Sequence, residues 1–273
     1  MPFRHAHHYI LALIALTIFA FWPTYFSVLS SSPWGFHFHG ITATMWLFLL
    51  ALQSWTIHDR RAALHRSLGI ASLALFPLFL AGGAAVVSSM AMATVAGNPF
   101  YQIYGARLGI MDGSSVVLLG YLYYQALKHR RSVQLHARYL LATPLPLIMP
   151  IAGRVINHLV PPLAIHGPQD FHLFAWGVRW ASLIGVAITA CLYASAPRHG
   201  RPFLIAGGVI VVQQMLFDSV GYTPAWQGVF LALGRVPVIA VVFATLAAGA
   251  GLSWAGWIAG ARPKRPAAAL NSG

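Results

Sequence analysis

Histidines and arginines recur in stretches of this chain that are otherwise apolar. The segment WGFHFHG, at 34–40, places His37 and His39 among aromatic residues and glycines. A neutral imidazole can ligate a metal or haem, and it can exchange a proton near neutral pH. Side chains two positions apart on a helix point about 200° from each other. These two histidines can therefore share one ligand only if the backbone is extended there.

Other ionisable residues follow at helical spacing. Arg154 and His158 are four residues apart, and His172 and Arg179 are seven apart, so each pair lies on one face of a helix. The guanidinium group binds carboxylate or phosphate through a planar fork of donors. We therefore expect a polar site for a small anionic ligand. Its candidate residues are His37, His39, Arg107, Asp112, Arg154, His158, His172, Arg179, Asp218 and Arg235.

The elements that must position these residues are predicted to be transmembrane helices. Of 273 residues, 58% are hydrophobic and 8% are charged, whereas a soluble domain carries about 25% charged residues. A helix needs roughly 20 apolar residues to cross a bilayer. The sequence predicts an all-α polytopic bundle of about eight spans, seven being the alternative. The apolar runs are 9–29, 36–57, 68–90, 108–127, 139–159, 171–193, 202–221 and 229–257.

The distribution of basic residues predicts the orientation of these spans. Thirteen of the 17 lysines and arginines fall in the termini and in alternate loops, and the loops at 30–35, 160–170 and 222–228 contain none. Short loops rich in Lys and Arg stay in the cytoplasm. Both termini are therefore predicted to be cytoplasmic. The net charge of +13 then reflects topology and contact with the lipid bilayer, and no nucleic-acid partner is expected.

One transmembrane domain is predicted at 1–261, followed by a short, basic, disordered tail at 262–273. With the predicted orientation, the candidate site residues lie in the outer half of the membrane, and Arg235 lies about two turns inside the last span. An ionised side chain at the centre of a span costs about 2.5–3.5 kcal/mol. We therefore expect these groups to face inward around one outward-open pocket. Prolines at 144, 146 and 150 predict a break in the fifth span just below it.

Three segments carry a resemblance to a known group of proteins: HFHGITATMWLFLLALQSWTI, ALHRSLGIA and LHARYLLATPLPLIMPIAGR. Together they resemble a group of uncharacterised bacterial multi-pass inner-membrane proteins. The matching residues are His37, His39, Trp46, Gln53, His65, Arg66, Leu68, Gly69, His136, Arg138, Ala142, Thr143, Gly153 and Arg154. The resemblance covers about residues 36–155. It implies the architecture and the inner-membrane location, and it implies no particular activity.

Several functions are compatible with these patterns. The first is transport or sensing of a small anionic ligand. The second is a redox role linked to haem or quinone, because haem b takes two axial imidazoles from facing helices. The third is a membrane enzyme of unknown reaction, for which no catalytic motif is present. The last is a purely structural polar network that holds the helices together.

The haem alternative names two possible levels in the membrane. An outer pair would combine His37 or His39 with His158 or His172, and an inner pair would be His65 and His136. This two-level layout has a weaker similarity to cytochrome b561-type bundles. The candidate haem or metal ligands are His39, His158, His65 and His136.

Two further patterns concern repetition and assembly. The segment from His58 to His65 recurs 71 residues later as His129 to His136, either through duplication of a helical hairpin or by chance. A ladder of small residues at spacing four predicts a packing face or a homodimer face in the last span. Its members are Ala247, Gly251 and Ala255.

Overall fold

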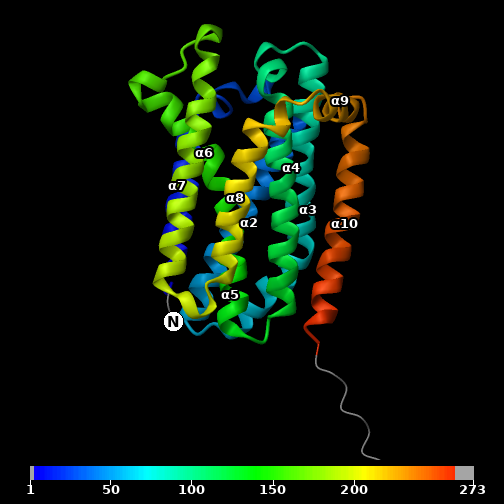
Figure 1. Cartoon of the computed structure of the whole chain (residues 1–273). Coiled ribbons are helices and arrows are strands. Elements are labelled where there is room, and N and C mark those ends of the chain that lie inside the picture. The colour runs from blue at the N-terminus through cyan, green and yellow to red at the C-terminus, as the bar shows by residue number, and fades with distance from the viewer. Residues whose placement is uncertain (1–2, 262–273) are drawn as a thin grey trace, which may run out of the picture.

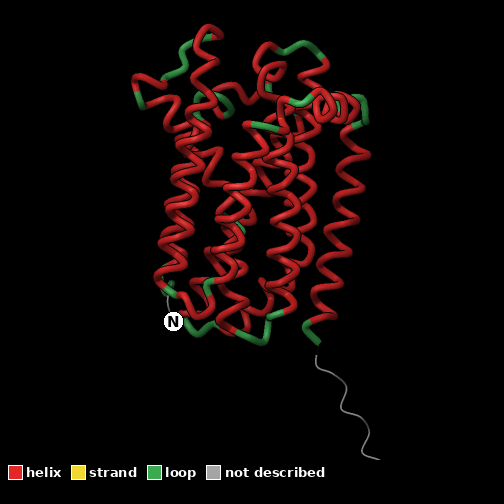
Figure 2. The backbone as a smooth tube through the Cα atoms, in the orientation of Figure 1, coloured by secondary structure: helices red, strands yellow, loops and turns green. Residues whose placement is uncertain are grey.

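A computed structural model describes residues 3–261, so the tail predicted at 262–273 lies outside the described residues. The α-helices are α1 (Ala6–Phe21), α2 (Trp34–His58), α3 (Ala62–Val95), α4 (Pro99–Lys128), α5 (Val133–Ala142), α6 (Leu145–Leu159), α7 (Phe174–Ser195), α8 (Arg201–Asp218), α9 (Pro224–Leu233) and α10 (Val238–Ala259). Short 3-10 helices occupy the connections: η1 (Phe26–Ser31), η2 (Pro161–Leu163), η3 (Pro168–Leu173), η4 (Pro197–His199) and η5 (Val220–Tyr222). Every regular element between residues 3 and 261 is thus helical, as predicted (Figure 2).

Six helical segments are long and apolar enough to cross a membrane. They are 34–58, 62–95, 133–159, 168–195, 201–222 and 238–259. The chain is therefore a multi-pass helical bundle of the integral membrane class. Helices α1 and α4, which contribute to the predicted count of eight, are not among the six; α1 is only 16 residues long.

The long helices run roughly along one axis (Figure 1). The start of α1, the α4–α5 connection and the end of α10 lie at one end, which we call the basic end because the Lys- and Arg-rich connections at 59–61, 128–132 and 196–201 are there. The opposite end, which carries η3 and α9, is called the distal end. Helix α3 packs against α2, α4 and α10, and α6 packs against α7.

Helix boundaries correct two of the predicted spans. The last predicted span, 229–257, is not continuous: α9 ends at Leu233, lies across the distal end, and is followed by a turn before α10 (Figure 1). Pro237 is the N-cap of α10, and its ring cannot continue a preceding helix. Helix α4 begins nine residues before the predicted 108, because the Asn98 side chain caps it by accepting the backbone N–H groups of Phe100 (3.1 Å) and Tyr101 (3.2 Å).

The predicted break in the fifth span is confirmed. Helix α5 ends at Ala142 and α6 begins at Leu145, with Pro144 between them, whereas Pro150 remains inside α6. The break is tied to α2 by Trp46, which is fully buried and donates its indole N–H to the Thr143 hydroxyl (3.0 Å). Trp46 also packs against Phe76, Phe79 and Tyr123, so a rigid aromatic core lies between the two ends of the bundle.

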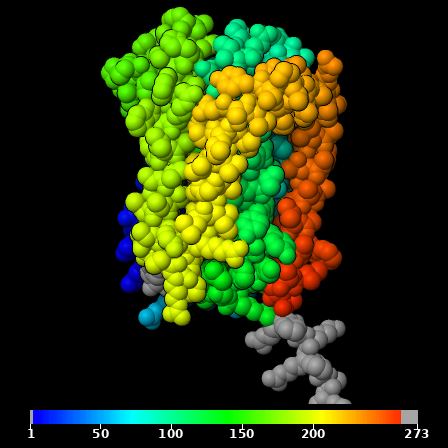
Figure 3. Space-filling model, in the orientation of Figure 1, coloured from blue at the N-terminus to red at the C-terminus, as the bar shows by residue number. Residues whose placement is uncertain are grey.

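Small residues on α10 form two faces. The buried face contacts α3 and α4 through Gly249, Ser253 and Gly256. The ladder of Ala247, Gly251 and Ala255 does not belong to it, and a Cβ added at Gly251 would meet open space. Beside the buried face, an apolar groove of about 610 Å³ runs between α4 and α10, where Figure 3 shows α4 between α8 and α10.

Candidate functional site

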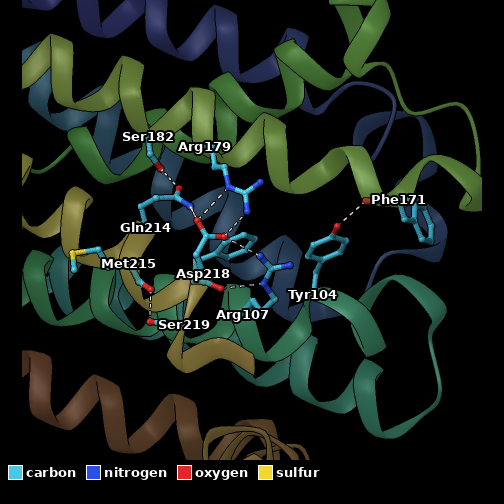
Figure 4. Close-up of polar contacts among 10 residues, drawn as sticks. Tyr104, Arg107, Phe171, Arg179, Ser182, Gln214, Met215, Asp218 and Ser219 are labelled. Atoms are coloured by element: carbon cyan, nitrogen blue, oxygen red, sulfur yellow. Dashed lines mark hydrogen bonds and ion pairs between the residues drawn. The ribbon is translucent and has the colours of Figure 1, made fainter. Parts of the chain in front are cut away.

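Three of the predicted site residues form one ion-pair network at the distal end. Asp218, the last residue of α8, accepts from Arg179 of α7 through two nitrogens, Nη2 at 2.9 Å and Nε at 3.2 Å. It also accepts from Nη2 of Arg107, on α4, at 3.2 Å (Figure 4). We call Arg107, Arg179 and Asp218 the distal network. It joins α4 to α7 and α8, which are consecutive helices but distant in the sequence from α4.

Arg107 is well satisfied although its side chain is only 3% exposed. Its Nε donates to the Phe217 carbonyl at 3.0 Å. Its guanidinium carbon lies 3.8 Å from the centre of the Phe217 ring, 4.1 Å from that of Tyr222 and 5.1 Å from that of Tyr104. A cation over aromatic faces is attracted by their quadrupoles. The protein thus supplies both a counter-ion and a polarisable lining for this buried charge.

Two uncharged side chains orient the Asp218 carboxylate. Gln214, one turn earlier on α8, donates to Oδ2 of Asp218 at 2.6 Å and accepts from the Ser182 hydroxyl at 2.8 Å (Figure 4). The carboxylate therefore receives donors from Arg107, Arg179 and Gln214. With two arginines and one aspartate, the distal network has a formal charge of +1.

Arg154 belongs to a second group on the distal side. Its Nη1 donates to the Pro150 carbonyl (3.0 Å), its Nε reaches the Thr24 hydroxyl (3.4 Å), and its guanidinium stacks 3.9 Å over the Phe21 ring. It therefore ties α6 to the end of α1. Asp112 is half-buried on α4 within electrostatic reach of Arg154, but in the described part of the chain the two make no ion pair within 4.0 Å.

The two histidines of the WGFHFHG segment do not share a ligand. Both belong to α2, whose first residue is Trp34, so the extended backbone that a shared ligand requires is not present. Nδ1 of His37 lies 2.8 Å from the Tyr25 hydroxyl, so one hydrogen bond joins these two side chains. His39 instead stacks on Phe79, with 6.1 Å between the ring centres.

The remaining predicted residues are dispersed. His158, near the end of α6, has no partner for its buried Nε2 among the described residues. His172 is exposed on η3, with Nδ1 3.0 Å from the Gln169 carbonyl. Arg235 is exposed in the turn between α9 and α10, so its predicted place two turns inside a span is wrong. The ten candidates thus lie on the distal side in several groups, and only three of them form one connected network.

A cavity of about 200 Å³ lies at the basic end, and none of those ten residues lines it. Its walls come from α2, the start of α3, the α4–α5 connection and α5, with Phe3 contributing from the N-terminal segment. Apolar side chains form most of its lining: Leu50, Ile57, Val133, Leu140 and Leu141. The polar lining residues that concern us are Gln53, His58, His65, His136 and Arg138. We call this the basic-end cavity.

Polar atoms around the basic-end cavity lack partners. Arg138 is only 4% exposed, yet its Nε and Nη1 have no hydrogen-bond acceptor among residues 3–261. The same holds for Oε1 of Gln53, Nε2 of His58 and Nδ1 of His65. Unpaired buried polar atoms are uncommon, and a buried charge without a counter-ion is costly by several kcal/mol. Several such atoms of the described residues are thus concentrated around one cavity.

The chain has few carboxylate side chains that could serve as a counter-ion for Arg138. It contains four carboxylate side chains and no glutamate. Three of these aspartates, at 112, 170 and 218, are on the distal side, and Asp59 pairs with Arg61 in the exposed connection between α2 and α3. Trp55 also stacks against Arg61, at 4.5 Å from its guanidinium carbon, which holds that pair at the surface. A counter-ion for Arg138 must therefore come from outside these side chains.

Haem does not fit this cavity. His65 and His136 both line it, and Nδ1 of His136 lies 2.8 Å from the Ala126 carbonyl, as in many metal-bound histidines. However, about 200 Å³ is below the roughly 300–1,000 Å³ of pockets for drug-sized ligands, and the haem macrocycle is larger still. Within the described residues there is also no group of three or more His, Cys, Asp or Glu that could hold a metal ion.

Sequence reasoning gave too little weight to Arg138 and His58. Both lie beside Lys- and Arg-rich loops, and a polar residue beside such a loop is usually interpreted as solvent-exposed. The signal that was available is the pair of matching segments at 58–65 and 129–136, because α3 begins at 62 and α5 begins at 133, also 71 residues apart. His65 and His136 therefore occupy equivalent first turns and line the same cavity.

Comparison of the chain with protein-family models, curated proteins and solved structures found no match.

Proposed function

We propose that this protein is an eight-span inner-membrane protein of bacteria with both termini in the cytoplasm. Helices α1 and α4 complete the count to eight, and α9 lies on the periplasmic surface. The concentration of Lys and Arg at the basic end supports this orientation. Reporter fusions at 59–61 and 129–132 should give cytoplasmic signals and fusions at 164–167 a periplasmic one; the reverse assignment would overturn the topology.

We further propose that the protein binds a small anionic ligand in the basic-end cavity, for transport or sensing. The single observation that carries this proposal is Arg138, a nearly buried guanidinium with two unpaired nitrogens and no carboxylate side chain to pair with. Arginine recognises a carboxylate or phosphate with two nitrogens at once. The apolar remainder of the lining suits the body of an organic acid. Under the proposed topology, the ligand reaches the cavity from the cytoplasm or the inner leaflet.

Thermal stabilisation of the purified protein tests this site. Benzoate, inorganic phosphate and an anionic phospholipid serve as probes, so that a free acid, a free anion and a lipid headgroup are distinguished. We expect at least one of them to stabilise the wild type and to fail with Arg138→Gln. Arg131→Gln removes an exposed arginine from the α4–α5 connection and is the matched control. Equal stabilisation of Arg138→Gln and wild type, or none by any probe, would overturn the proposal.

A second candidate site is the distal side, as predicted from the sequence. The observation that favours it is the formal charge of +1 on the distal network, whose Asp218 carboxylate is shared by two arginines. If a ligand binds there or beside Arg154, stabilisation by anions will be lost in Arg179→Gln or Arg154→Ala and kept in Arg198→Ala. Since Arg107, Arg154 and Arg179 already have partners within the chain, this site ranks below the cavity.

A redox role linked to haem or quinone has a direct test. An absorption spectrum of the purified protein with a Soret band at stoichiometric haem, lost in His39→Ala or His158→Ala, would select it. A colourless, folded protein would remove the haem alternative.

A further inference from the structure

We infer that the ligand of the basic-end cavity is a small hydroxylated acid, in which one apolar body carries both an acidic group and a hydroxyl donor. This inference rests on the proposed anion site and names the class of compound that the site would select. It follows from which atoms of the cavity donate hydrogen bonds and which accept them.

The Ser54 hydroxyl, which has no partner among residues 3–261, can donate or accept in the cavity, and Arg138 supplies the charged donor. Its unpaired Nε and Nη1 belong to one planar guanidinium, which matches the two oxygens of one carboxylate. Arg130 also lines the cavity, but its Nη1 already donates to the carbonyls of Trp257 (2.6 Å) and Leu127 (3.2 Å). Its guanidinium also lies 4.4 Å over the Trp257 ring. The acidic group of the ligand is therefore expected at Arg138.

His58 is a free acceptor. Its Nδ1 lies 2.6 Å from the Ser54 carbonyl, which can only accept, so Nδ1 carries the proton of the neutral ring. The lone pair is then on Nε2, the buried nitrogen that has no partner between residues 3 and 261. His136 is held in the same way by the Ala126 carbonyl, so its Nε2 is also an acceptor. The two backbone carbonyls thus set both imidazoles to receive a hydrogen bond.

Gln53 adds a third acceptor to the same wall. Its Oε1 is buried without a partner among residues 3–261, and Gln53, five residues before His58 on α2, lines the cavity with it. A simple carboxylate such as benzoate presents only acceptors to this wall. It would satisfy Arg138 and leave Gln53 and His58 unpaired. A hydroxyl on the ligand body donates where the cavity accepts, and so completes the pairing.

The size and lining of the cavity limit the body of the ligand. An apolar cavity of about 150 Å³ can hold benzene, so about 200 Å³ accommodates one aromatic ring with two substituents. Leu50, Leu140 and Leu141 supply apolar contact for such a ring. The hydroxybenzoates have this size and carry a carboxylate and a hydroxyl on one ring, so they are suitable probes of the class.

The experiment measures the dissociation constants of benzoate, 3-hydroxybenzoate and 4-hydroxybenzoate by calorimetry on the full-length protein. We expect the better hydroxybenzoate to bind the wild type about tenfold more tightly than benzoate, as one buried hydrogen bond allows. His58→Phe keeps a ring but removes one acceptor, so the preference for the hydroxybenzoate over benzoate should fall well below tenfold. His58→Gln restores an acceptor oxygen and should recover part of the preference.

His129→Phe is the matched control, because His129 is the repeat counterpart of His58 but stacks on Tyr139 instead of lining the cavity. It should leave the preference unchanged. If the wild type binds benzoate and hydroxybenzoates equally, in a manner that depends on Arg138, the hydroxyl inference fails while the anion site stands. If none of the three acids binds while phosphate or the anionic phospholipid still stabilises the protein through Arg138, the inference fails and the anion site stands. If no probe of either experiment acts, the proposed function itself fails. If the preference for the hydroxybenzoate over benzoate survives in His58→Phe and also in Gln53→Leu, the assignment of these two residues as acceptors is overturned.

Discussion

Arg107 and Arg138 are both almost fully buried, one at each end of the bundle, and only Arg107 has a carboxylate beside it. Arg107 donates to Asp218 and to a backbone carbonyl and is surrounded by aromatic rings. Arg138 faces a cavity with two nitrogens unpaired in the described chain. The same side chain is therefore part of a completed network at the distal end and part of an incomplete one at the basic end.

Under the proposed anion site, this difference separates a charge that stabilises the fold from a charge that binds a ligand. A completed network lowers the free energy of the folded chain itself. An incomplete one costs free energy until a partner arrives, and such a cost is kept in a protein when binding depends on it. The two regions should consequently respond in opposite ways when their charges are removed.

The largest effect is expected for Asp218→Ala. This change leaves Arg107 buried without a counter-ion, so we expect the free energy of unfolding to fall by about 3–5 kcal/mol. Denaturation of the purified protein in detergent measures it. Asp218→Asn keeps the shape of the side chain and one of its two acceptor oxygens. It should therefore lower the free energy of unfolding by less than Asp218→Ala. A loss under about 1 kcal/mol for Asp218→Ala would show that the distal network contributes little to stability.

Gln214→Leu should have the next largest effect. It removes the hydrogen bond to the Asp218 carboxylate and leaves the Ser182 hydroxyl without its acceptor. A hydrogen bond to a charged group contributes about 1.5–3 kcal/mol, and the same unfolding measurement should record a loss in this range. Gln227→Leu, an exposed glutamine on α9, is the control and should be neutral.

Arg138→Leu should act in the opposite direction. Replacing an unpaired buried cation with the shorter, apolar leucine side chain should raise the free energy of unfolding by about 1–2 kcal/mol in ligand-free protein. Arg107→Leu, its counterpart at the distal end, should lower that free energy. If both substitutions destabilise the protein equally, the distinction between the two ends is lost.

The smallest effect is expected for Asp59→Ala. Asp59 pairs with Arg61 at the basic end, but both side chains are about half exposed, at 46% and 54%. An exposed ion pair contributes about 0–1 kcal/mol, so thermal midpoints of this variant and the wild type should nearly coincide. A large fall in the thermal midpoint of Asp59→Ala would mean that Asp59 contacts Arg138 in solution. Asp59 would then be the counter-ion of Arg138.

Local sequence was sufficient to predict the helical membrane class, the apolar segments and the break at 143–144. Each of these depends on residues close together in the chain: runs of apolar side chains about one bilayer long, and prolines that cannot continue a helix. The separate direction of α9 was missed because the residues at 229–257 are apolar throughout, and hydropathy does not distinguish a helix across the bundle end from one along its axis. Only the Gly234–Pro237 turn, a local feature, marked the change of direction.

Pairing between helices depended on the packed structure. The sequence placed Arg107, Arg179 and Asp218 at one depth, but it could not indicate that they meet while Arg154 and Asp112 form no ion pair, because the rotation of each helix about its axis is set by its neighbours. The basic-end cavity was hidden for the same reason. His58, His65, His136 and Arg138 are separated by up to 80 positions and share one wall only after α2, α3 and α5 have packed around it. Which charges find partners is a property of that packing, since a side chain's own sequence neighbours fix its depth in the membrane and leave its direction open.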